Sequence, residues 1–513
     1  MKTTTRVKKI NGHEYLYEIT YYYDKETRRT RQKSRYLGKY VDGKPVRVRE
    51  KAKSPERVYA YGELIPYLNA IRTLDLSGIL ETHLTEHETR ICLTLAIAAL
   101  TCPDAIYNPG AWFEGTALSR VYPGLKISSQ TVSKLLKKIG ETGISMDICR
   151  TYISRRETAE SRVYDLMIPQ LRFSAANKRH KSNVQFFDQV SLYYDRDLSV
   201  PAAYMPHPKN LTATRLVKNA VAGMHIFHYR NTTLISGREF NSAMNIYGLI
   251  FSGTPFVIPI NPDNELVREE IRRHRSELMH PKNLKIFHGE TLFVVPITIP
   301  VESVQMHGYI CYSPRQDEEE RNEYTEDLDL IIESLHNIPI YRWTDPADAV
   351  LDIAGKYEQF IQWKVDDNRL MVNVKQKAVA RQLRDAGVSV LLYAGGEFQW
   401  DQCMQWTSEQ QEDEEFFSTV TSRLQIYPHT VDAETIRQGI YLIAFISLML
   451  KRWVERQLEA AGLLSVSSIQ KIMIDLEKIR LIGLGNDRTV VTGLHPRQQD
   501  ILESLKWQID LQI

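Results

Sequence analysis

Acidic side chains at three places in the chain could bind a divalent metal ion if the fold brought them together. Asp188 follows an apolar run at 184–187, Glu239 lies in a polar turn, and Glu414 stands within the acidic run 409–415. Hard oxygen ligands suit Mg²⁺, and carboxylates that hold two such ions about 4 Å apart activate water or a 3′-hydroxyl in phosphoryl transfer. The simpler interpretations are an aspartate that caps a turn and an acidic run that forms a solvated helix face.

The segment 232–260 must position the second of these acids. An apolar stretch at 232–236 predicts a strand, and a polar turn follows at 237–242. An amphipathic stretch at 243–251 ends at a glycine and precedes a second apolar strand at 255–260. The pattern is therefore strand, turn, helix and strand, with Glu239 in the turn.

The bulk composition is that of an ordinary globular protein, because 43% of the 513 residues are hydrophobic and 25% are charged. This length predicts two to four domains. The formal net charge of +2 is unevenly spread: residues 1–57 carry 17 Lys and Arg and 7 Asp and Glu, a net charge of +10, which leaves −8 for the rest. A basic arm on an acidic body suits a module that binds a polyanion, although a solvated tail has the same composition.

Neither the cysteines nor the apolar segments indicate export or a membrane. The five cysteines are scattered, without the spacing of a zinc site, which predicts reduced thiols. The N-terminus is charged and lacks the apolar stretch of a signal peptide. The longest apolar run, 440–450, is shorter than the roughly 20 residues of a membrane span. We therefore expect a cytoplasmic protein.

The first segment, 15–38, predicts a β-hairpin. Aromatic and polar residues alternate at the period of a strand before a turn at 24–27, and a strongly basic strand follows. Basic residues interleaved with tyrosines suit a DNA backbone, since Arg and Lys neutralise phosphates and tyrosine hydroxyls can donate to them. The expected DNA contacts are Arg28, Arg29, Arg31, Lys33 and Arg35. The alternative is a hairpin whose tyrosines cover a neighbouring domain.

Residues 59–140 predict helices, because apolar residues recur at helical spacing. In 128–141, either Ser128 or Ser129 suits the N-cap, and apolar residues share one side of the expected helix. The opposite side carries Lys134, Lys137 and Lys138. A short capped helix with a basic face after a turn resembles the second helix of a DNA-binding helix-turn-helix. An ordinary surface helix has the same pattern.

The middle of the chain predicts an α/β core. Strand-like runs at 183–194 and 199–206 precede a helix at 211–221 that begins near Thr212 or Thr214, and a further strand lies at 225–236. Strands followed by alternating helices and strands suit an RNase H-like core. Residues 265–400 then carry further strand-like runs between acidic helical patches, and they interrupt the core before its closing helix.

The predicted fold class is therefore α/β (α+β), an RNase H-like catalytic core with a β-rich insertion. The expected parts are a basic β-hairpin arm (1–57), a helical DNA-binding domain (58–165), the first part of the core (180–264), the insertion (265–400), the closing part of the core (401–460) and a C-terminal helical tail (461–513).

With these elements in this order, the chain resembles the insertion-sequence DDE transposases over nearly its whole length. The resemblance is to the group that has a β-rich insertion in the core. The turn at 237–242 is similar to the consensus Leu-Val-x-Asp-Arg-Gly-Phe-x-Ser of that family, through Arg238, Phe240 and Ser242. The aspartate of the consensus is replaced by Gly237. Glu239 lies two residues further on, and on a continuing strand it would point to the same side as Gly237.

The resemblance implies three catalytic carboxylates. Asp188 would be the first, with Ser191 where the family has Thr or Ser, and Glu239 is the candidate substitute for the second. The third belongs to a helical pattern Tyr-x-x-Arg-x-x-x-Glu with a later lysine, and counting back from 416–417 places it at Glu414. The remaining positions of this pattern, which do not match, are Thr407, Gln410 and Thr421. The assignment is left open by the neighbouring acids Glu409, Glu412, Asp413 and Glu415.

The same resemblance implies Mg²⁺ or Mn²⁺ held by Asp188 and Glu414, double-stranded DNA of transposon ends as the partner, and a homodimer. It also adds Arg238 to the expected DNA contacts. One carboxylate is retained, one is lost and one is ambiguous, so we expect impaired catalysis. The two hypotheses are an active transposase and a transposase-derived DNA-binding protein without catalysis. A nuclease of another kind would need an intact acidic cluster, which the sequence does not show.

Overall fold

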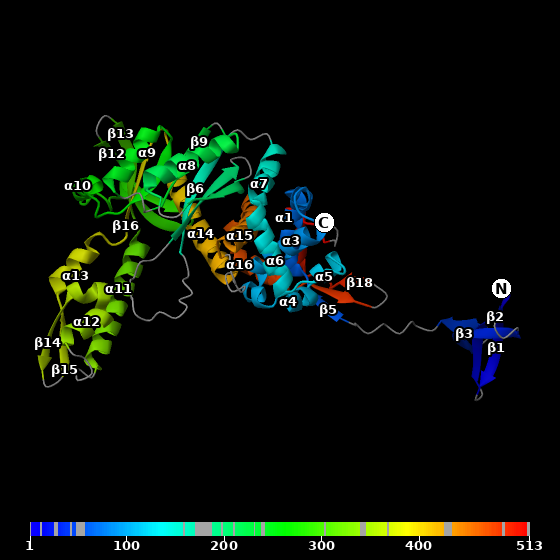
Figure 1. The fold of residues 1–513 in the computed structure, drawn as a ribbon. Helices are drawn as coiled ribbons and strands as arrows, with labels where there is room; N and C mark the ends of the chain where they lie inside the picture. Colours follow the sequence, from blue (N-terminus) through cyan, green and yellow to red (C-terminus); the bar gives the residue numbers. More distant parts are fainter. Residues whose placement is uncertain are drawn as a thin grey trace. The chain divides into compact units, whose positions relative to one another are not determined.

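The structure is a computed structural model that divides the chain into two units. One unit is Met1–Tyr59 with Leu481–Thr492, and the other is Ala60–Arg480 with Gly493–Ile513 (Figure 1). The residues that the structure describes are 2–10, 13–24, 29–41, 44–47, 57–156, 160–169, 187–195, 199–208, 211–229, 231–237, 242–301, 304–338, 345–366, 369–424, 433–484 and 488–509.

The first unit contains an antiparallel sheet and most of a second, smaller sheet. A four-stranded sheet has the order β1-β2-β3-β4, with strands Lys2–Ile10, His13–Asp24, Arg29–Val41 and Lys44–Arg47. The hairpin predicted at 15–38 is confirmed by the pairing of β2 with β3. A three-stranded sheet has the order β18-β17-β5, with β5 at Arg57–Ala60, β17 at Arg480–Gly483 and β18 at Thr489–Val491. The tail predicted as helical therefore also contains strands.

The second unit begins with the predicted helical segment. Its α-helices are α1 (Ile65–Thr73), α2 (Leu76–Glu81), α3 (Glu86–Thr101), α4 (Pro109–Gly115), α5 (Leu118–Val121), α6 (Ser129–Thr142) and α7 (Ile144–Ser154). Ser128 is the N-cap of α6, as predicted, because its hydroxyl accepts from the backbone of Thr131.

The long helix α15 (Ala433–Ala460) packs against α3 and α6. The two helix axes can approach closely because glycines stand at the crossing. A Cβ atom on Gly140 of α6 would lie 1.8 Å from the carbonyl oxygen of Thr435. A Cβ atom on Gly439 of α15 would lie 2.3 Å from the carbonyl oxygen of Leu136. Larger side chains at either position would force the helices apart.

A nine-stranded mixed sheet follows, with the order β11-β12-β13-β16-β10-β9-β6-β7-β8 (Figure 1). Within it, β6, β7 and β8 are antiparallel neighbours, and β9 and β10 run parallel to β6. The order β8-β7-β6-β9-β10 is that of an RNase H-like core, and it confirms the predicted fold class. The strands and connecting helices are β6 (Glu160–Pro169), β7 (Phe187–Asp195), β8 (Val200–Pro206), α8 (Ala213–Ile226), β9 (Asn231–Ile235), α9 (Ala243–Ser252) and β10 (Phe256–Ile260). The predicted boundary at residue 165 falls inside β6.

The insertion enters the chain after β10 and returns to the sheet as β16, which pairs with β10 and β13. It lengthens the sheet by four strands and also contains helices, in agreement with the acidic helical patches predicted between its strands. Its elements are α10 (Glu265–His274), β11 (Leu284–Phe287), β12 (Glu290–Val301), β13 (Val304–Tyr312), α11 (Pro314–His336), α12 (Pro346–Ala354), β14 (Ile361–Asp366), β15 (Arg369–Val374), α13 (Gln376–Gln382) and β16 (Val388–Ala394).

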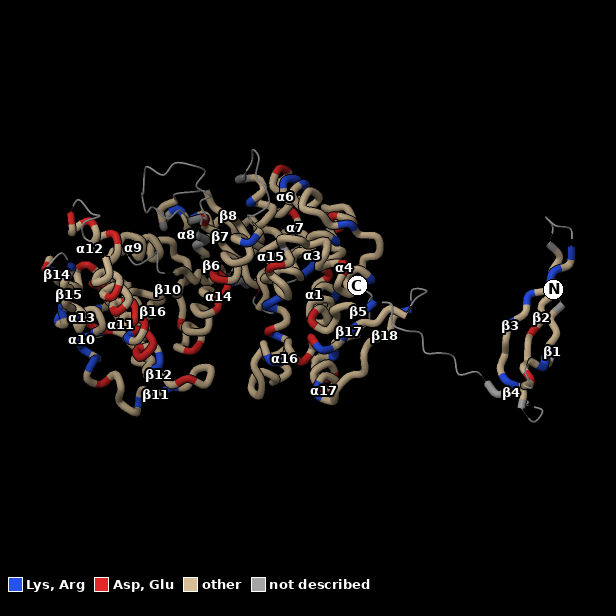
Figure 2. The backbone as a smooth tube through the Cα atoms, turned by 90° about the horizontal axis from the view of Figure 1, so that it is seen from below, with Lys and Arg blue, Asp and Glu red and all other residues tan. Residues whose placement is uncertain are grey.

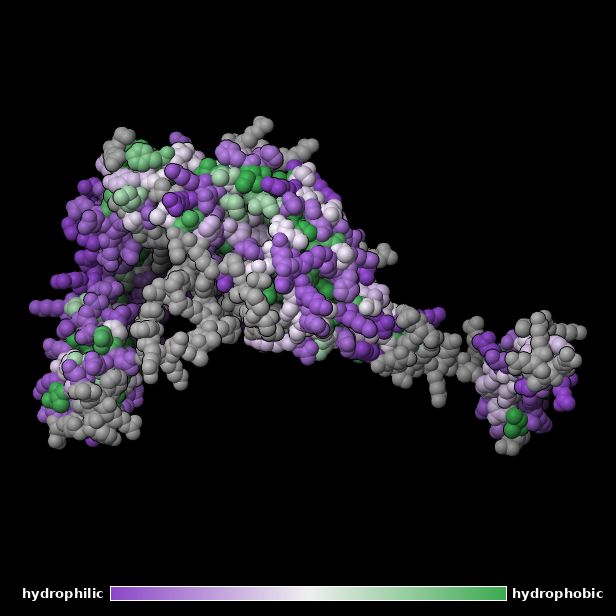
Figure 3. All heavy atoms as spheres, viewed as in Figure 1, coloured by the Kyte–Doolittle hydropathy of each residue, from purple (hydrophilic) through white to green (hydrophobic). Residues whose placement is uncertain are grey.

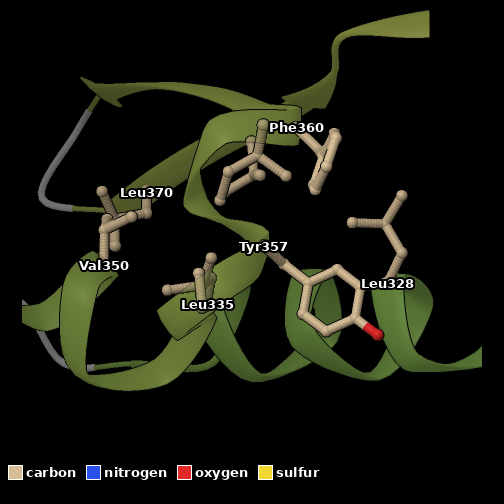
Figure 4. Packing of buried hydrophobic residues seen from close by; sticks show 9 residues of the cluster. Leu328, Leu335, Val350, Tyr357, Phe360 and Leu370 are labelled. Atoms are coloured by element: carbon tan, nitrogen blue, oxygen red, sulfur yellow. The ribbon is translucent and has the colours of Figure 1, made fainter. Parts of the chain in front are cut away.

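Part of the insertion forms a lobe with its own hydrophobic core. Helices α11 and α12 pack against the β14–β15 hairpin around Leu328, Leu335, Val350, Phe360 and Leu370, all of which are buried (Figure 4). A separate apolar core is what a segment needs to fold as a local unit.

The chain closes with helices. They are α14 (Trp400–Leu424), α15, α16 (Ile469–Glu477) and α17 (Pro496–Leu505). Helix α14 packs on β6, the central strand of the core. Among the residues that the structure describes, no helix combines the length and the apolar character that a bilayer span needs.

Candidate functional site

Asp188 lies at the start of β7, whereas the sequence predicted it at the end of a strand. The strand runs from Phe187 to Asp195, because its apolar alternation continues beyond Asp188. The carboxylate is 8% exposed and is held from α15. Tyr441 donates its hydroxyl to Asp188 Oδ2 at 2.6 Å, and Arg437 Nη1 lies 3.2 Å from the same oxygen.

The predicted second position lies at the end of β9. Ser236 donates its backbone N–H to Val257 of β10, and the next residue, Gly237, is buried. The proposed substitute Glu239 and the predicted DNA contact Arg238 lie outside the described residues, as does Arg28 of the arm.

The core topology draws attention to Asp165, which the sequence analysis missed. Asp165 lies on β6, opposite Ser191 of β7. Strand β6 also pairs with the parallel strand β9, in a register that joins Tyr164 to Ile235. Asp165 therefore lies beside Ser236, one residue before Gly237. Ligands of open α/β sheets bind at the carboxyl ends of parallel strands, which makes this a candidate position.

The signal for Asp165 was present but weak. Residues 160–169 alternate little, and the predicted helical domain, 58–165, includes the first six of them. A strand buried on both faces lacks clear alternation, so its periodicity does not distinguish it from a buried helix segment.

Opposite Asp165, Ser191 is fully buried and forms a hydrogen bond with His207. The Ser191 Oγ to His207 Nε2 distance is 2.7 Å. Burial lowers the pKa of His207 to about 4, so the imidazole is neutral at physiological pH. The pair lies at a small cavity of about 280 Å³ that His207 lines together with Asp188 and Tyr441. A fully buried serine cannot reach a polymeric substrate, so the pair stabilises the β7–β8 edge.

Glu414, the predicted third carboxylate, lies on α14 and is half-buried. Gln410 Nε2 donates to its Oε2 at 3.2 Å. The non-matching positions of the family pattern are buried, and Thr407 donates its hydroxyl to the carbonyl of Cys403. None of these neighbours is a cation that could approach a phosphate.

The carboxylates that α14 turns toward the sheet are Glu409 and Asp413, one helical turn apart. Asp413 is fully buried and accepts a hydrogen bond from Tyr194 of β7. Arg452 of α15 donates to Asp413 Oδ1 through Nε at 2.8 Å. Burial raises the pKa of Asp413 to about 6, against the opposing effect of Arg452.

Glu409 is held in the same way. Tyr164 of β6 donates to Glu409 Oε2 at 2.6 Å, and Arg456 of α15 forms an ion pair with Oε1. Burial alone would raise the pKa of Glu409, but Arg162 and Arg456 lower it below its ordinary value. The Arg162 guanidinium also lies 5.5 Å from the ring of Trp406.

Two helices thus present complementary charges at the same spacing. Glu409 on α14 pairs with Arg456 on α15, and Asp413 pairs with Arg452. The two acids are four residues apart on their helix, and so are the two arginines on theirs. The matched spacing of these charges is visible in the sequence, but the acidic run at 409–415 suggested a solvated helix face instead. The basic end of α15 packs against α14 and buries Glu409 and Asp413.

Mg²⁺ does not fit the described carboxylates. Asp188 is bonded by Tyr441 and Arg437, and the buried acids of α14 are neutralised by arginines. A guanidinium at a carboxylate occupies the oxygen atoms that a metal ion would use. In the described part of the chain, no group of three or more His, Cys, Asp or Glu could hold a metal ion.

The basic residues predicted on the arm share one face of a strand. Arg29, Arg31, Lys33 and Arg35 alternate along β3 and are all exposed. The opposite face of this sheet carries tyrosines, among them Tyr17 and Tyr36, whose ring centroids are 5.5 Å apart. The two faces are mixed to some extent, because Tyr22 lies across from Arg31 on the basic face and Lys8 lies over the ring of Tyr17 on the other.

The lysines predicted on α6 are less available. Lys138 is bonded to both carboxylate oxygens of Glu88 at 2.8 Å, and Lys137 pairs with Glu141 at 3.4 Å. Lys134 is exposed. The apolar side of α6 is buried as predicted, through Val132, Leu135, Leu136 and Ile139.

Comparisons with known proteins do not assign the chain to a family. No family model matches the chain, and no curated protein matches it. Among solved structures, the chain is similar to a piggyBac transposase in a synaptic complex with hairpin DNA, with a TM-score of 0.30 and 9% identity. That alignment covers 81% of this chain and 78% of the other. A TM-score of this size carries no argument about fold or function.

Proposed function

We propose that the chain is a DNA-binding protein of the DDE transposase type in which metal-dependent strand cleavage is lost or strongly reduced. The observation that carries the proposal is the pairing of Glu409 and Asp413 with Arg456 and Arg452. On α14, the helix that closes the core, the carboxylates that face the sheet form ion pairs with arginines, so their oxygen atoms are not available to a metal ion. The RNase H-like strand order and Gly237 at the end of β9 agree with this proposal.

The exposed basic face of β3 supports binding to double-stranded DNA. Residues two apart on a strand are separated by about 6.8 Å. Four cations in such a row can neutralise several phosphates of a DNA backbone. Contacts of this kind give affinity without sequence specificity. Transposon ends remain the expected DNA and a homodimer the expected assembly.

An active, Mg²⁺-dependent transposase is the second candidate. It is favoured by the register of Asp165, in the middle of β6, beside Ser236 at the carboxyl end of the parallel strand β9. In that case Asp165, rather than Asp188, would be the first carboxylate, and the second would have to come from a residue other than Gly237.

The deciding experiment measures cleavage and binding together. Purified full-length protein is mixed with Mg²⁺ or Mn²⁺ and labelled DNA that carries the repeats flanking its gene. The native chain is compared with Asp165→Ala, Asp188→Ala and Gly237→Asp. We expect binding without cleavage by the native chain, and the appearance of weak cleavage in Gly237→Asp. Cleavage by the native chain that disappears in Asp165→Ala would establish the second candidate instead.

A further inference from the structure

Helix α10 and the turn Leu383–Asp385 enclose a cavity of about 410 Å³ whose walls are mainly basic. Its charged lining consists of four arginines and one aspartate, and a proline and an isoleucine complete it. The arginines are Arg268, Arg272, Arg275 and Arg384, all exposed to solvent. Figure 3 shows hydrophilic side chains over this part of the surface, and the Lys and Arg positions of α10 are blue in Figure 2.

All four guanidinium groups are held in place by the protein, Arg272 through an ion pair with Glu269 at 2.7 Å. Arg275 Nη1 donates to Asp385 Oδ1 at 2.7 Å, and Arg384 Nη2 donates to Asp385 Oδ2 at 2.7 Å. Arg268 donates to the backbone carbonyl of Asp263. The Asp385 side chain is only 13% exposed, so it holds the guanidinium groups of Arg275 and Arg384 from the inner side of the cavity. Groups fixed before binding lose less conformational freedom when a ligand arrives.

The charge of the cavity remains positive after these pairings. Four guanidinium groups stand against two carboxylates, that of Asp385 in the lining and that of Glu269 paired with Arg272, which leaves two positive charges at its walls. A neighbouring cavity of about 430 Å³ shares Pro262 and Asp385, but its lining includes the acids Glu320, Glu323 and Asp327. An anion is therefore repelled from the neighbouring cavity and attracted to the one beside α10.

We propose that the cavity beside α10 binds phosphate, and that its source is the backbone of a nucleic acid. Guanidinium groups present paired N–H donors that match phosphate oxygens. Arg268 and Arg272 lie one turn apart on α10, and Arg275 is its C-cap in a helical backbone conformation, so the three share one face. This inference rests on the proposed function only in naming nucleic acid as the source of the phosphate.

The test uses two neighbouring arginines with different positions. Arg272 lines the cavity and pairs with Glu269 at 2.7 Å, whereas Arg273 does not line it and pairs with Glu270 at 2.7 Å. Their side chains are 65% and 62% exposed, so Arg273→Gln is a matched control for Arg272→Gln. Full-length variants are titrated with inorganic pyrophosphate and with a labelled DNA duplex at several salt concentrations.

We expect Arg272→Gln to weaken pyrophosphate binding by about tenfold, and to lower the slope of duplex affinity against salt by about one phosphate contact. Arg273→Gln should leave both unchanged. Equal behaviour of the two variants with both probes would overturn the site. An effect on pyrophosphate alone would overturn nucleic acid as the source. If the native chain bound pyrophosphate but no duplex, the proposed function would fail while the phosphate site stood.

Discussion

Arg452 of α15 and Asp413 of α14 form a buried ion pair, with 2.7 Å between Nη2 and Oδ1 and side chains that are 7% and 0% exposed. The pair joins the two helices that close the core. Removing one partner of such a pair is costly because the other charge stays buried without compensation.

We therefore expect Arg452→Met to destabilise the protein by about 3–5 kcal/mol. The double variant Asp413→Leu/Arg452→Met should recover much of that loss, because the fully buried carboxylate is removed together with its partner, while Glu455 keeps its ion pair with Lys451. Urea unfolding midpoints provide the measurement. Arg150→Met is a suitable control, since Arg150 is 54% exposed and pairs with Asp147 on the surface of α7. Equal losses for Arg452→Met and Arg150→Met would contradict the prediction.

The neutral state of His207 predicts a loss of stability in acid. Its pKa is about 4 in the folded protein and 6.5 in the unfolded chain, so the unfolded chain binds more protons between these values. The free energy of unfolding should then fall as the pH drops from about 6.5 to 4, by up to about 3 kcal/mol.

The variant His207→Gln removes this titration and should flatten that part of the stability profile. His225→Gln changes an exposed histidine on α8 and is the control. Unfolding curves at a series of pH values measure the difference. Parallel profiles for native protein and His207→Gln would show that His207 does not titrate in this way.

The basic face of β3 predicts a salt-dependent contact with DNA. The double variant Arg31→Gln/Lys33→Gln should weaken duplex binding and lower the salt slope by about two phosphate contacts. Arg6→Gln/Lys8→Gln removes the same charge from the opposite face, because Arg6 pairs with Tyr17 while Arg31 pairs with Tyr22. Fluorescence anisotropy at several salt concentrations compares them. Identical slopes for the two variants would assign the effect to net charge alone.

The close crossing of α6 and α15 predicts that Gly140→Ala is harmful. The new Cβ atom would lie 1.8 Å from a backbone oxygen, which no side-chain rotation can relieve. We expect a loss of at least 1–3 kcal/mol of stability, measured by thermal or urea unfolding. Gly115→Ala is the control, because a Cβ atom there meets nothing within 4 Å. A Gly140→Ala variant as stable as native protein would mean that the two helices can separate freely.

Local features of this chain could be predicted from its sequence. The cap at Ser128 and the buried side of α6 depend on residues within a few positions of each other. The β2–β3 hairpin follows from alternation on both sides of a short turn. The RNase H-like order was predicted from the alternation of strands and helices, and the strand pairing confirms it.

Features that depend on distant partners could not be predicted in the same way. Strand β6 owes its place to β7 and β9, and this hid Asp165 from an analysis by periodicity. The local sequence predicts that the acids at 409 and 413 are solvated. In the structure they pair with arginines of α15, about forty residues later in the chain, and are buried. Both errors arise because burial is decided by packing between elements rather than within one.

The chain enters and leaves the lobe of α11, α12, β14, β15 and α13 at adjacent positions of the sheet. Tyr312 and Val388 are direct partners at the ends of β13 and β16, and Ser313 donates its backbone N–H to the carbonyl of Gly387 at 2.9 Å. The lobe therefore occupies the place of a hairpin turn, since a tight turn could also connect β13 to β16 in this register. Evolution or an engineer could exchange residues 313–387 for another module, or excise them, and leave the strand register intact.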